Sequence, residues 1–248
     1  MTRVFFDVHS GLPREGPGSD RSTRKAFTMI PGLPRAPRIL DVGCGPGAQT
    51  VCLASLSGGK VVAVDNHLPF LRSLARTIGA RKLADRIFPV AADMNRLPLP
   101  PGSFDLVWAE GSIYISGLEN GLAQWRPLLK KKGAIAYTEI SWLREEIPEE
   151  LDRFWKEAYP AIGPISRNTE ILERAGFEPL GTFVLPESDW WDEYYNNILA
   201  KIPLLKSKYR NDAEALQVLD VEEAEMNLYR KYSSYYGYVF YIGRRGGK

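Results

Sequence analysis

A glycine-rich segment over residues 41–47 is the first stretch of the chain that could do chemistry. It has the pattern Asp-x-Gly-x-Gly-x-Gly, with Asp41 at its start and Gly43, Gly45 and Gly47 at alternate positions, and it follows a short apolar run. Glycine is needed where the backbone takes unusual dihedral angles or where a ligand approaches closer than a Cβ permits. A helix that follows such a loop points its free N–H groups at the same place. The segment therefore predicts a ligand-binding turn between a buried strand and a helix.

The spacing of the glycines indicates which kind of ligand the loop holds. Dinucleotide sites have the pattern G-x-G-x-x-G, with a pyrophosphate on the helix N-terminus. The pattern here is shorter by one residue and begins with an acid. An acid at the entrance of the loop suits a ligand with a cationic ammonium better than a pyrophosphate.

Three more carboxylates end the apolar runs that follow the loop. Asp65 ends the run 60–65, 22 positions after Gly43, which matches the acid that binds a ribose in nucleotide-binding α/β folds. Asp93 ends the run 86–93, and Glu110 ends the run 104–110. Ligands of parallel sheets bind beyond the carboxyl ends of the strands, so we expect all these acids in one crevice.

Strands and helices alternate along the first 140 residues. The first strand is predicted just before the glycine loop, and the others at 60–65, 86–93, 104–110 and 133–140. Helices lie between the strands, the last of them at 118–129. This order predicts an α/β fold with a doubly wound, Rossmann-like sheet and helices on both faces. The remaining elements are predicted as helices at 148–159 and 169–175 and strands at 177–185 and 235–245.

Two segments stand outside this alternation. Residues 7–18 are a coil rich in glycine and proline, and the coil carries His9, Arg14 and Glu15, a mixture suited to folding over a polar ligand. The alternative is a flexible leader, followed by a helix that Ser19 or Asp20 caps. About 50 residues separate the last two strands, which is far longer than an ordinary connection. We interpret the insertion, at about 187–234, as a helical cap or a dimerisation element.

Residues 38–140 resemble the class I S-adenosylmethionine-dependent methyltransferases, whose first motif has the form [DE]-x-G-x-G-x-G. Residues 97–99 and 104–107 look like the group related to the ubiquinone and menaquinone C-methyltransferases. That group often has Leu-Lys-Pro-Gly-Gly before the fifth strand, whereas this chain has three lysines at 130–132, which we expect in a solvated turn. The resemblance implies a seven-stranded, mostly parallel sheet with an antiparallel last strand.

The resemblance also implies the cofactor and its contacts. The cofactor would be S-adenosyl-L-methionine, with S-adenosyl-L-homocysteine as product and no metal. The glycine loop would wrap the methionine part, Asp65 would bind the ribose hydroxyls, and Asp93 and Met94 would border the adenine. The full set of expected cofactor contacts is Arg14, Asp41, Gly43, Cys44, Gly45, Gly47, Asp65, Asn66, His67, Asp93, Met94 and Glu110.

Glu110 and Tyr114 are the candidates for catalysis. Glu110 is expected as a base or an anchor for the acceptor, and Tyr114 as a phenol lining the acceptor pocket. The alternatives are that Glu110 only holds the cofactor ammonium and that Tyr114 only packs under the cap. His67 follows the ribose acid, so we expect it at the edge of the cofactor.

The resemblance and the composition together predict one methyltransferase domain over residues 1–248. Its parts would be an N-terminal arm and helix at 1–36, a cofactor-binding core at 37–140, and an acceptor-side half at 141–248. The chain has 248 residues and a net charge of +2, which is too mild for a nucleic-acid surface. We therefore expect a small-molecule acceptor and no nucleic-acid partner. A homodimer through the insertion is a further expectation.

The location follows from other features. The chain has no apolar run of about 18 residues that would span a membrane, and its start lacks the apolar region of a secretory signal. Two cysteines at 44 and 52 fit a reducing cytoplasm. We expect a cytoplasmic protein.

The first functional hypothesis is methyl transfer from the sulfonium cofactor to a small molecule by in-line displacement. Neither Asn-Pro-Pro-[Tyr/Phe] nor Pro-Cys follows the fourth strand, which argues against methylation of adenine, glutamine or cytosine C5. The alternatives are an NAD(P)-binding oxidoreductase and a nucleoside-cofactor-binding protein without turnover. The sequence leaves open the acceptor, its attacking atom, the oligomeric state and whether residues 7–18 form a lid.

Overall fold

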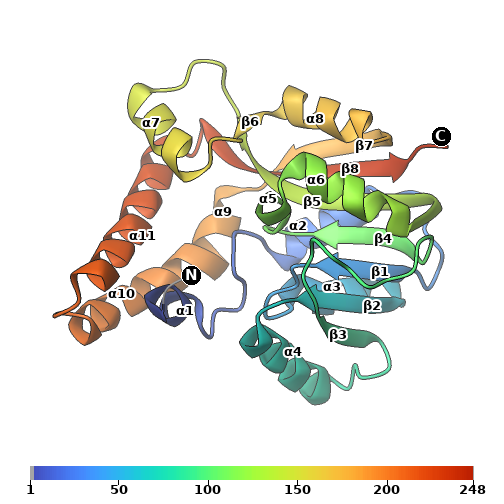
Figure 1. Cartoon of the computed structure of the whole chain (residues 1–248), viewed down its shortest axis with the longest axis horizontal. Helices are drawn as coiled ribbons and strands as arrows, with labels where there is room; N and C mark the ends of the chain where they lie inside the picture. Colours follow the sequence, from blue (N-terminus) through green and yellow to red (C-terminus); the bar gives the residue numbers. More distant parts are fainter. Residues whose placement is uncertain (1–2, 248) are drawn as a thin grey trace.

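One mixed sheet forms the centre of the molecule, with its strands in the order β3-β2-β1-β4-β5-β8-β7 (Figure 1). The computed structural model describes residues 3–247, so Met1, Thr2 and Lys248 of the predicted domain lie outside it. The first five strands are parallel, and β8 runs antiparallel to both of its neighbours, which confirms the predicted doubly wound sheet. The two-residue β6 pairs with the end of β5. The strands are β1 (Arg38–Val42), β2 (Lys60–Asp65), β3 (Ile87–Ala91), β4 (Phe104–Ala109), β5 (Leu129–Trp142), β6 (Gly163–Pro164), β7 (Phe177–Val184) and β8 (Tyr236–Arg245).

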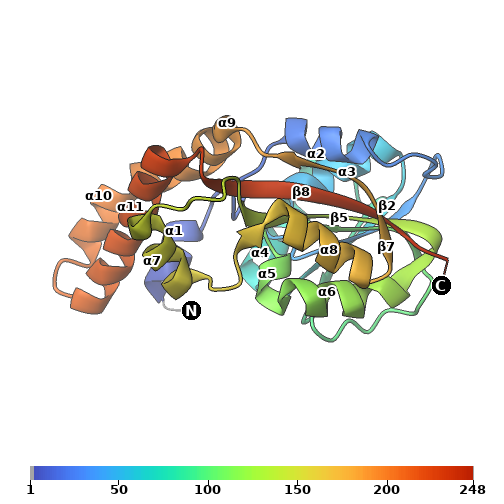
Figure 2. The same cartoon turned by 90° about the horizontal axis from the view of Figure 1, so that it is seen from above.

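Helices cover both faces of the sheet (Figure 2). Successive side chains of a strand point to opposite faces, so Ile39 of β1 packs with the helices of one face and Leu40 with those of the other. Each face therefore has its own apolar core. The first face carries α2 (Asp20–Thr28), α3 (Ala48–Ser57) and α4 (Leu68–Arg81), and the second carries α5 (Ile113–Ser116), α6 (Leu118–Trp125) and α8 (Ile165–Arg174).

A third apolar cluster forms a helical cap at one end of the sheet (Figure 1). Its centre is aromatic: Trp190 stacks on Tyr229 with ring centroids 4.0 Å apart, and Tyr195 is buried beside them. The predicted helical insertion is confirmed, and a homodimer through it stays a prediction. The cap consists of α1 (Arg3–His9), α7 (Glu149–Ala158), α9 (Glu187–Trp190), the π-helical turn η2 (Trp191–Tyr195), α10 (Asn196–Lys208) and α11 (Ala213–Tyr232).

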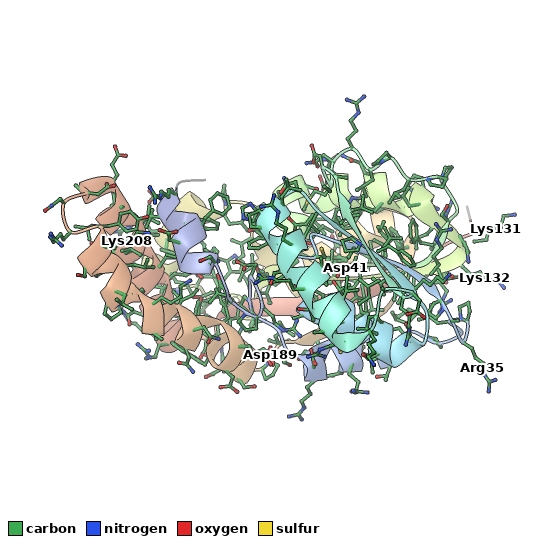
Figure 3. All side chains as sticks on the ribbon, turned by 90° about the horizontal axis from the view of Figure 1, so that it is seen from below. Arg35, Asp41, Lys131, Lys132, Asp189 and Lys208 are labelled. Atoms are coloured by element: carbon green, nitrogen blue, oxygen red, sulfur yellow. The ribbon has the colours of Figure 1, made fainter. Side chains whose placement is uncertain are left out.

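Three local predictions were wrong. Residues 7–9 belong to α1 rather than to a coil, because the buried side chains of Val4 and Val8 pack that helix against the cap. The lysines at 130–132 lie in β5 rather than in a turn, and their exposed side chains project from the edge of the molecule, where Figure 3 labels two of them. The predicted helix 118–129 ends as an α-helix at Trp125, because Pro127 lacks the N–H that would continue it.

The point where the strand order reverses lies between β1 and β4. From β1 the chain builds outward through β2 and β3, and then returns to place β4 on the other side of β1. In open α/β sheets, ligands bind in the crevice outside the carboxyl ends of the strands at such a point.

Asp41 is an ionisable residue inside this sheet. It pairs with Ala63 of β2 and Trp108 of β4, and its side chain is fully buried (Figure 3). The hydroxyl of Thr50 in α3 donates to Asp41 Oδ2 at 2.5 Å, and Gln49 Nε2 donates to Oδ1 at 3.5 Å. Burial raises the pKa of Asp41 from 3.8 to about 7, and the Thr50 hydrogen bond offsets part of that effect.

Replacing this acid should change how stability depends on pH. The folded-state pKa of Asp41 lies above its unfolded value, so the folded protein binds more protons between pH 4 and pH 7, and stability falls as pH rises through that window. The contribution of this one group is roughly 4 kcal/mol at most. In Asp41→Asn, the free energy of unfolding measured by denaturant titration should fall less steeply over this range than in the wild type.

The matched control is Asp85→Asn, since Asp85 is exposed in the turn between α4 and β3. Its slope should equal that of the wild type. An unchanged slope in Asp41→Asn would contradict the role of this buried carboxyl.

Candidate functional site

A cavity of about 400 Å³ lies at the carboxyl edge of the sheet, where the strand order reverses. The glycine loop forms one wall, and the segments that follow β2, β3 and β4 form others. The last wall comes from the N-terminus, where α1 and the residues after it face the glycine loop. Segments far apart in sequence therefore enclose one space.

The glycine loop is packed so tightly that its first glycine has no room for a side chain. Gly43 has a φ of 70°, and a Cβ there would lie 2.4 Å from the Cβ of Ser112. The Ser112 hydroxyl donates to the carbonyl of Val42 at 2.6 Å, which fixes the segment after β4 against the end of β1. At Gly47, with a φ of 95°, a Cβ would lie 2.3 Å from Leu74 Cδ1. Both glycines are required by close packing and by their left-handed backbone.

Asp65 is held in place by backbone N–H groups. Gly45 N donates to its Oδ2 at 2.9 Å, and His67 N donates to its Oδ1 at 2.8 Å. A carboxylate oxygen has two lone pairs, so each oxygen of Asp65 can accept one more hydrogen bond from a ligand in the cavity. The loop and the end of β2 thus orient a carboxylate that is still able to bind hydroxyls.

Another part of the cavity wall is both polar and aromatic. Asp93 and Met94 line the cavity two and three residues past the end of β3, and Asn66 lines it just past β2. The rings of Phe6 and His67 stack there with centroids 4.4 Å apart and planes 6° apart. Phe6 comes from α1, so the N-terminal helix contributes to this part of the wall.

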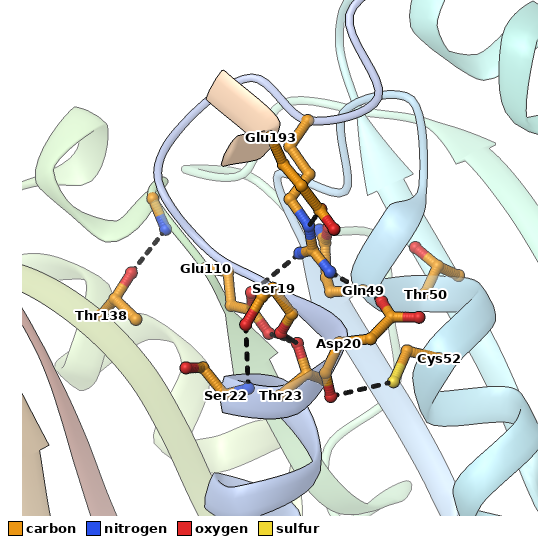
Figure 4. Close-up of polar contacts among 12 residues, drawn as sticks. Ser19, Asp20, Ser22, Thr23, Gln49, Thr50, Cys52, Glu110, Thr138 and Glu193 are labelled. Atoms are coloured by element: carbon orange, nitrogen blue, oxygen red, sulfur yellow. Dashed lines mark hydrogen bonds and ion pairs between the residues drawn. The ribbon is translucent and has the colours of Figure 1, made fainter. Parts of the chain in front are cut away.

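Glu110 lies just past β4 and accepts hydrogen bonds from three elements. Its Oε1 accepts from Trp108 Nε1 at 2.8 Å and from the Thr23 hydroxyl at 2.7 Å, as Figure 4 shows for Thr23. A guanidinium N–H of Arg14 donates to its Oε2 at 3.2 Å. Burial raises the pKa of Glu110, and the charge of Arg14 opposes that rise. The carboxylate thereby joins β4, α2 and the N-terminus.

The N-terminal strap, which we define as residues 10–19 between α1 and α2, crosses the cavity. Arg14 is buried at its middle and contacts three carboxylates: Glu110, Glu193 of η2 at 2.9 Å and Asp20 of α2 at 2.8 Å. Gly18 N also donates to the carbonyl of Asp189 at 3.0 Å. The structure therefore places residues 14–17 on the cavity wall.

His9 lines the same wall from the end of α1. Its Nδ1 lies 3.0 Å from Glu15 Oε2, and its Nε2 lies 3.7 Å from Glu222 Oε1 of α11. Burial by itself would lower the pKa of His9, but the two carboxylates raise it to about 9. At neutral pH this imidazole is therefore a cation, held between two acids.

Most of the predicted site residues meet at this cavity. Two do not: Asp41 lies beneath the loop, bound to α3, and Gly47 packs against α4. Arg14 reaches the wall, but protein carboxylates occupy its Nε and both of its terminal nitrogens. The predicted residues on the wall are Arg14, Gly43, Cys44, Gly45, Asp65, Asn66, His67, Asp93, Met94, Glu110 and Tyr114.

Sequence reasoning missed several wall residues. Ser112 follows the predicted acid by two positions, so its place beside Glu110 was a usable signal. Phe5 and Phe6 had no such signal, because only the tertiary fold brings α1 to the carboxyl edge of the sheet.

Residues 3–247 contain no group of three or more histidine, cysteine, aspartate or glutamate side chains arranged to hold a metal ion. In the same range, every helix is too short or too polar to cross a bilayer.

Comparisons with known proteins agree with this geometry. A family model described as a methyltransferase domain matches residues 39–133. Over 148 residues the chain is 35% identical to a demethylmenaquinone methyltransferase of Clavibacter sepedonicus, which covers 57% of this chain and 58% of that protein. Over 137 residues it is 32% identical to a malonyl-[acyl-carrier protein] O-methyltransferase of Pseudescherichia vulneris, which covers 55% of this chain and 49% of that protein.

A solved structure extends the likeness to the whole fold. The S-adenosylmethionine-dependent methyltransferase from Thiobacillus denitrificans, in complex with S-adenosyl-L-homocysteine, aligns with a TM-score of 0.82 at 16% identity and covers 98% of each chain. The chain spans 36% to 50% of the length of three malonyl-[acyl-carrier protein] O-methyltransferases that it matches. Residues 39–133 therefore match a methyltransferase domain, and they contain the reversal point of the sheet and the glycine loop that meets Asp65.

Proposed function

We propose that this protein binds S-adenosyl-L-methionine in the cavity and transfers its methyl group to a small molecule. The observation that carries the proposal is the meeting of the glycine loop with Asp65, Asp93 and Glu110 around one cavity of about 400 Å³. When bound there, the cofactor supplies an electrophilic methyl group on a sulfonium. The family match supports the same function.

The charges on the wall fit such a cofactor. Four carboxylates line the cavity, at Glu15, Asp65, Asp93 and Glu110, whereas its cations Arg14 and His9 are each paired with more than one acid. A wall with an excess of negative charge attracts a cationic ligand and repels a pyrophosphate. This balance favours a sulfonium nucleoside over NAD(P).

The chain's own residues would act mainly by positioning. Asp65 would accept the ribose hydroxyls, and Asp93 and Met94 would border the base. The strap and α1 would cover the bound cofactor and exclude water. Orientation and a dry site are the main sources of acceleration when a positive charge disperses in the transition state.

The roles of Glu110 and Tyr114 stay predictions. The three donors around Glu110 support an anchoring role over that of a base, because a carboxylate already bonded on both oxygens is a poor proton acceptor. Tyr114 lines the cavity with 42% of its surface accessible, which supports its place in an acceptor pocket.

The choice between cofactors can be tested directly. Calorimetric titration of the protein with S-adenosyl-L-homocysteine should show binding, and titration with NAD or NADP should not. Binding of NAD or NADP without binding of S-adenosyl-L-homocysteine would favour the hypothesis of an NAD(P)-binding oxidoreductase. Cofactor binding without any methylated product from a metabolite extract would favour the hypothesis of a nucleoside-cofactor-binding protein without turnover.

Removing the ribose acid should weaken cofactor binding. In Asp65→Ala, the affinity for S-adenosyl-L-homocysteine should fall by about 1–3 kcal/mol, because the hydroxyls lose their buried acceptor and Gly45 N loses its partner. Calorimetry measures the loss. Asp85→Ala removes an exposed acid at the opposite edge of the sheet and should leave the affinity unchanged. Equal affinity in both variants would refute the ribose role.

Adding one carbon to the loop should have a similar effect for a steric reason. A Cβ at Gly43 would collide with Ser112, so Gly43→Ala should displace the segment after β4 and weaken S-adenosyl-L-homocysteine binding by about tenfold or more. Gly102→Ala is the matched control, because Gly102 has nearly the same φ of 64° but open space around its Cβ position.

Both alanine variants carry the cost of a left-handed backbone, roughly 1–2 kcal/mol of stability. Only the Gly43 variant should also lose affinity. A parallel loss of affinity in Gly102→Ala would show that backbone strain, and not the contact with Ser112, is responsible.

A further inference from the structure

A buried acid with no assigned task lies behind the part of the cavity that Tyr114 lines. Glu139 belongs to β5, one residue past Thr138, whose hydroxyl accepts a hydrogen bond from Gly111 N beside Glu110. The side chain of Glu139 is 2% exposed, and within residues 3–247 its Oε2 has no hydrogen-bond partner. A buried carboxyl oxygen without a partner is costly unless a ligand or a proton satisfies it.

Two tyrosines connect Glu139 with the cavity. Burial raises the pKa of Glu139, and the nearby hydroxyl of Tyr159 lowers it by acting as a hydrogen-bond donor. The ring of Tyr159 meets the ring of Tyr114 edge to face, with centroids 6.0 Å apart and planes 80° apart. Since Tyr114 lines the cavity and contacts Tyr159, the ring of Tyr159 lies behind that wall on the side of Glu139.

A second buried acid approaches the same rings from the cap. Glu225 of α11 accepts a hydrogen bond from the Tyr195 hydroxyl at 2.8 Å. Burial raises the pKa of Tyr114 and of Tyr238, and the charges of Glu139 and Glu225 add to both shifts. We name these five residues, Tyr114, Tyr159, Tyr238, Glu139 and Glu225, the acceptor chamber.

The cations around the chamber are already neutralised or lie outside it. Arg14 contacts three carboxylates, and His9 lies between Glu15 and Glu222. Arg167 of α8 acts on Tyr159, but its side chain is exposed and donates to the carbonyl of Ala161. Within residues 3–247, an anionic acceptor would therefore meet two acids without an available cation, whereas an ammonium would meet two acids and aromatic rings, which attract cations.

We propose that the acceptor chamber binds a cationic amine as the methyl acceptor and that Glu139 receives its proton. The inference rests on the proposed function and adds the class of the acceptor. It excludes a carboxylate as the attacking group.

The proton and electron balance is simple. The ammonium gives one proton to the Glu139 carboxylate through the Tyr159 hydroxyl, which frees the nitrogen lone pair. The lone pair forms the new N–C bond while the C–S bond breaks and leaves its electron pair on sulfur. The sulfonium charge thus moves to the methylated ammonium, and the proton stays on Glu139.

The proton affinity of Glu139 suits this task. Burial raises its pKa to about 7, and the hydrogen bond from Tyr159 offsets part of the rise. A group with a pKa near the working pH exchanges protons most effectively. Burial raises the pKa of the five phenols near Glu139, at Tyr114, Tyr137, Tyr159, Tyr238 and Tyr241, so none of them titrates near pH 7. Burial also raises the pKa of Glu225 to about 7, so the second acid of the chamber titrates in the same range.

Three ring compounds that differ only in charge test the chamber. Protein saturated with S-adenosyl-L-homocysteine is titrated in a calorimeter with benzyltrimethylammonium, benzyl alcohol and benzoate. The cation should bind at least tenfold more tightly than benzoate. Equal or tighter binding of benzoate, or no binding of the cation, would overturn the proposal.

Variants then assign the effect to Glu139. At pH 8, Glu139→Gln should weaken binding of the cation at least fivefold, whereas Glu157→Gln, which removes an exposed acid of α7, should not. Because a quaternary ammonium cannot lose a proton, its affinity for the wild type should increase from pH 6 to pH 8, and this increase should be smaller in Glu139→Gln. An unchanged pH profile in that variant would refute the role of Glu139.

Two further measurements separate a failure of the chamber proposal from a variant that does not fold and from a failure of the proposed function. Tyr159→Phe removes only the connecting hydroxyl and replaces Glu139→Gln if that variant does not fold, and it should also weaken cation binding. Titration with S-adenosyl-L-homocysteine alone tests the proposed function. If it shows no binding, the same ring compounds titrated into the free protein still test the chamber.

Discussion

The arrangement of the site depends on one buried guanidinium. Arg14 contacts carboxylates from the end of β4, from α2 and from η2, and these three elements belong to the sheet, to one helical layer and to the cap. Removing one partner of a buried ion pair leaves the other charged and uncompensated, at a typical cost of about 3–5 kcal/mol. Arg14 therefore fixes the strap across the cavity and at the same time allows Glu110 to stay buried as a carboxylate.

The acids of the site are of two kinds, which differ in whether protein donors occupy their oxygens. Asp41 and Glu110 hold elements of the fold together, and their oxygens are bonded to protein donors. Asp65 is oriented by backbone N–H groups but keeps acceptor capacity toward the cavity, and Glu139 has an oxygen without a partner. Asp41, Asp65 and Glu110 all lie at or beside the end of a strand, so position by itself does not distinguish a structural acid from a binding acid. The hydrogen-bond partners do.

An excess of negative charge extends from the cofactor end of the cavity to the chamber behind Tyr114. Both cations that the described residues place on the wall, Arg14 and His9, are paired with two or more carboxylates. A positively charged donor and a positively charged acceptor would both gain from such a wall. Their mutual repulsion would be reduced once the acceptor has given up its proton to a buried carboxyl.

The amino-acid sequence by itself determined the alternation of strands and helices, the glycine loop and the acids at the strand ends. These are local patterns: the apolar period, the glycine spacing and the 22 residues from Gly43 to Asp65 can be read within short windows. Only the tertiary structure decided which acids face the ligand, since the partners of Arg14 lie 96 and 179 positions away at Glu110 and Glu193. It also decided that α1 lines the cavity and that Asp41 does not. Contacts over such separations depend on how whole elements pack, and no local pattern records that packing.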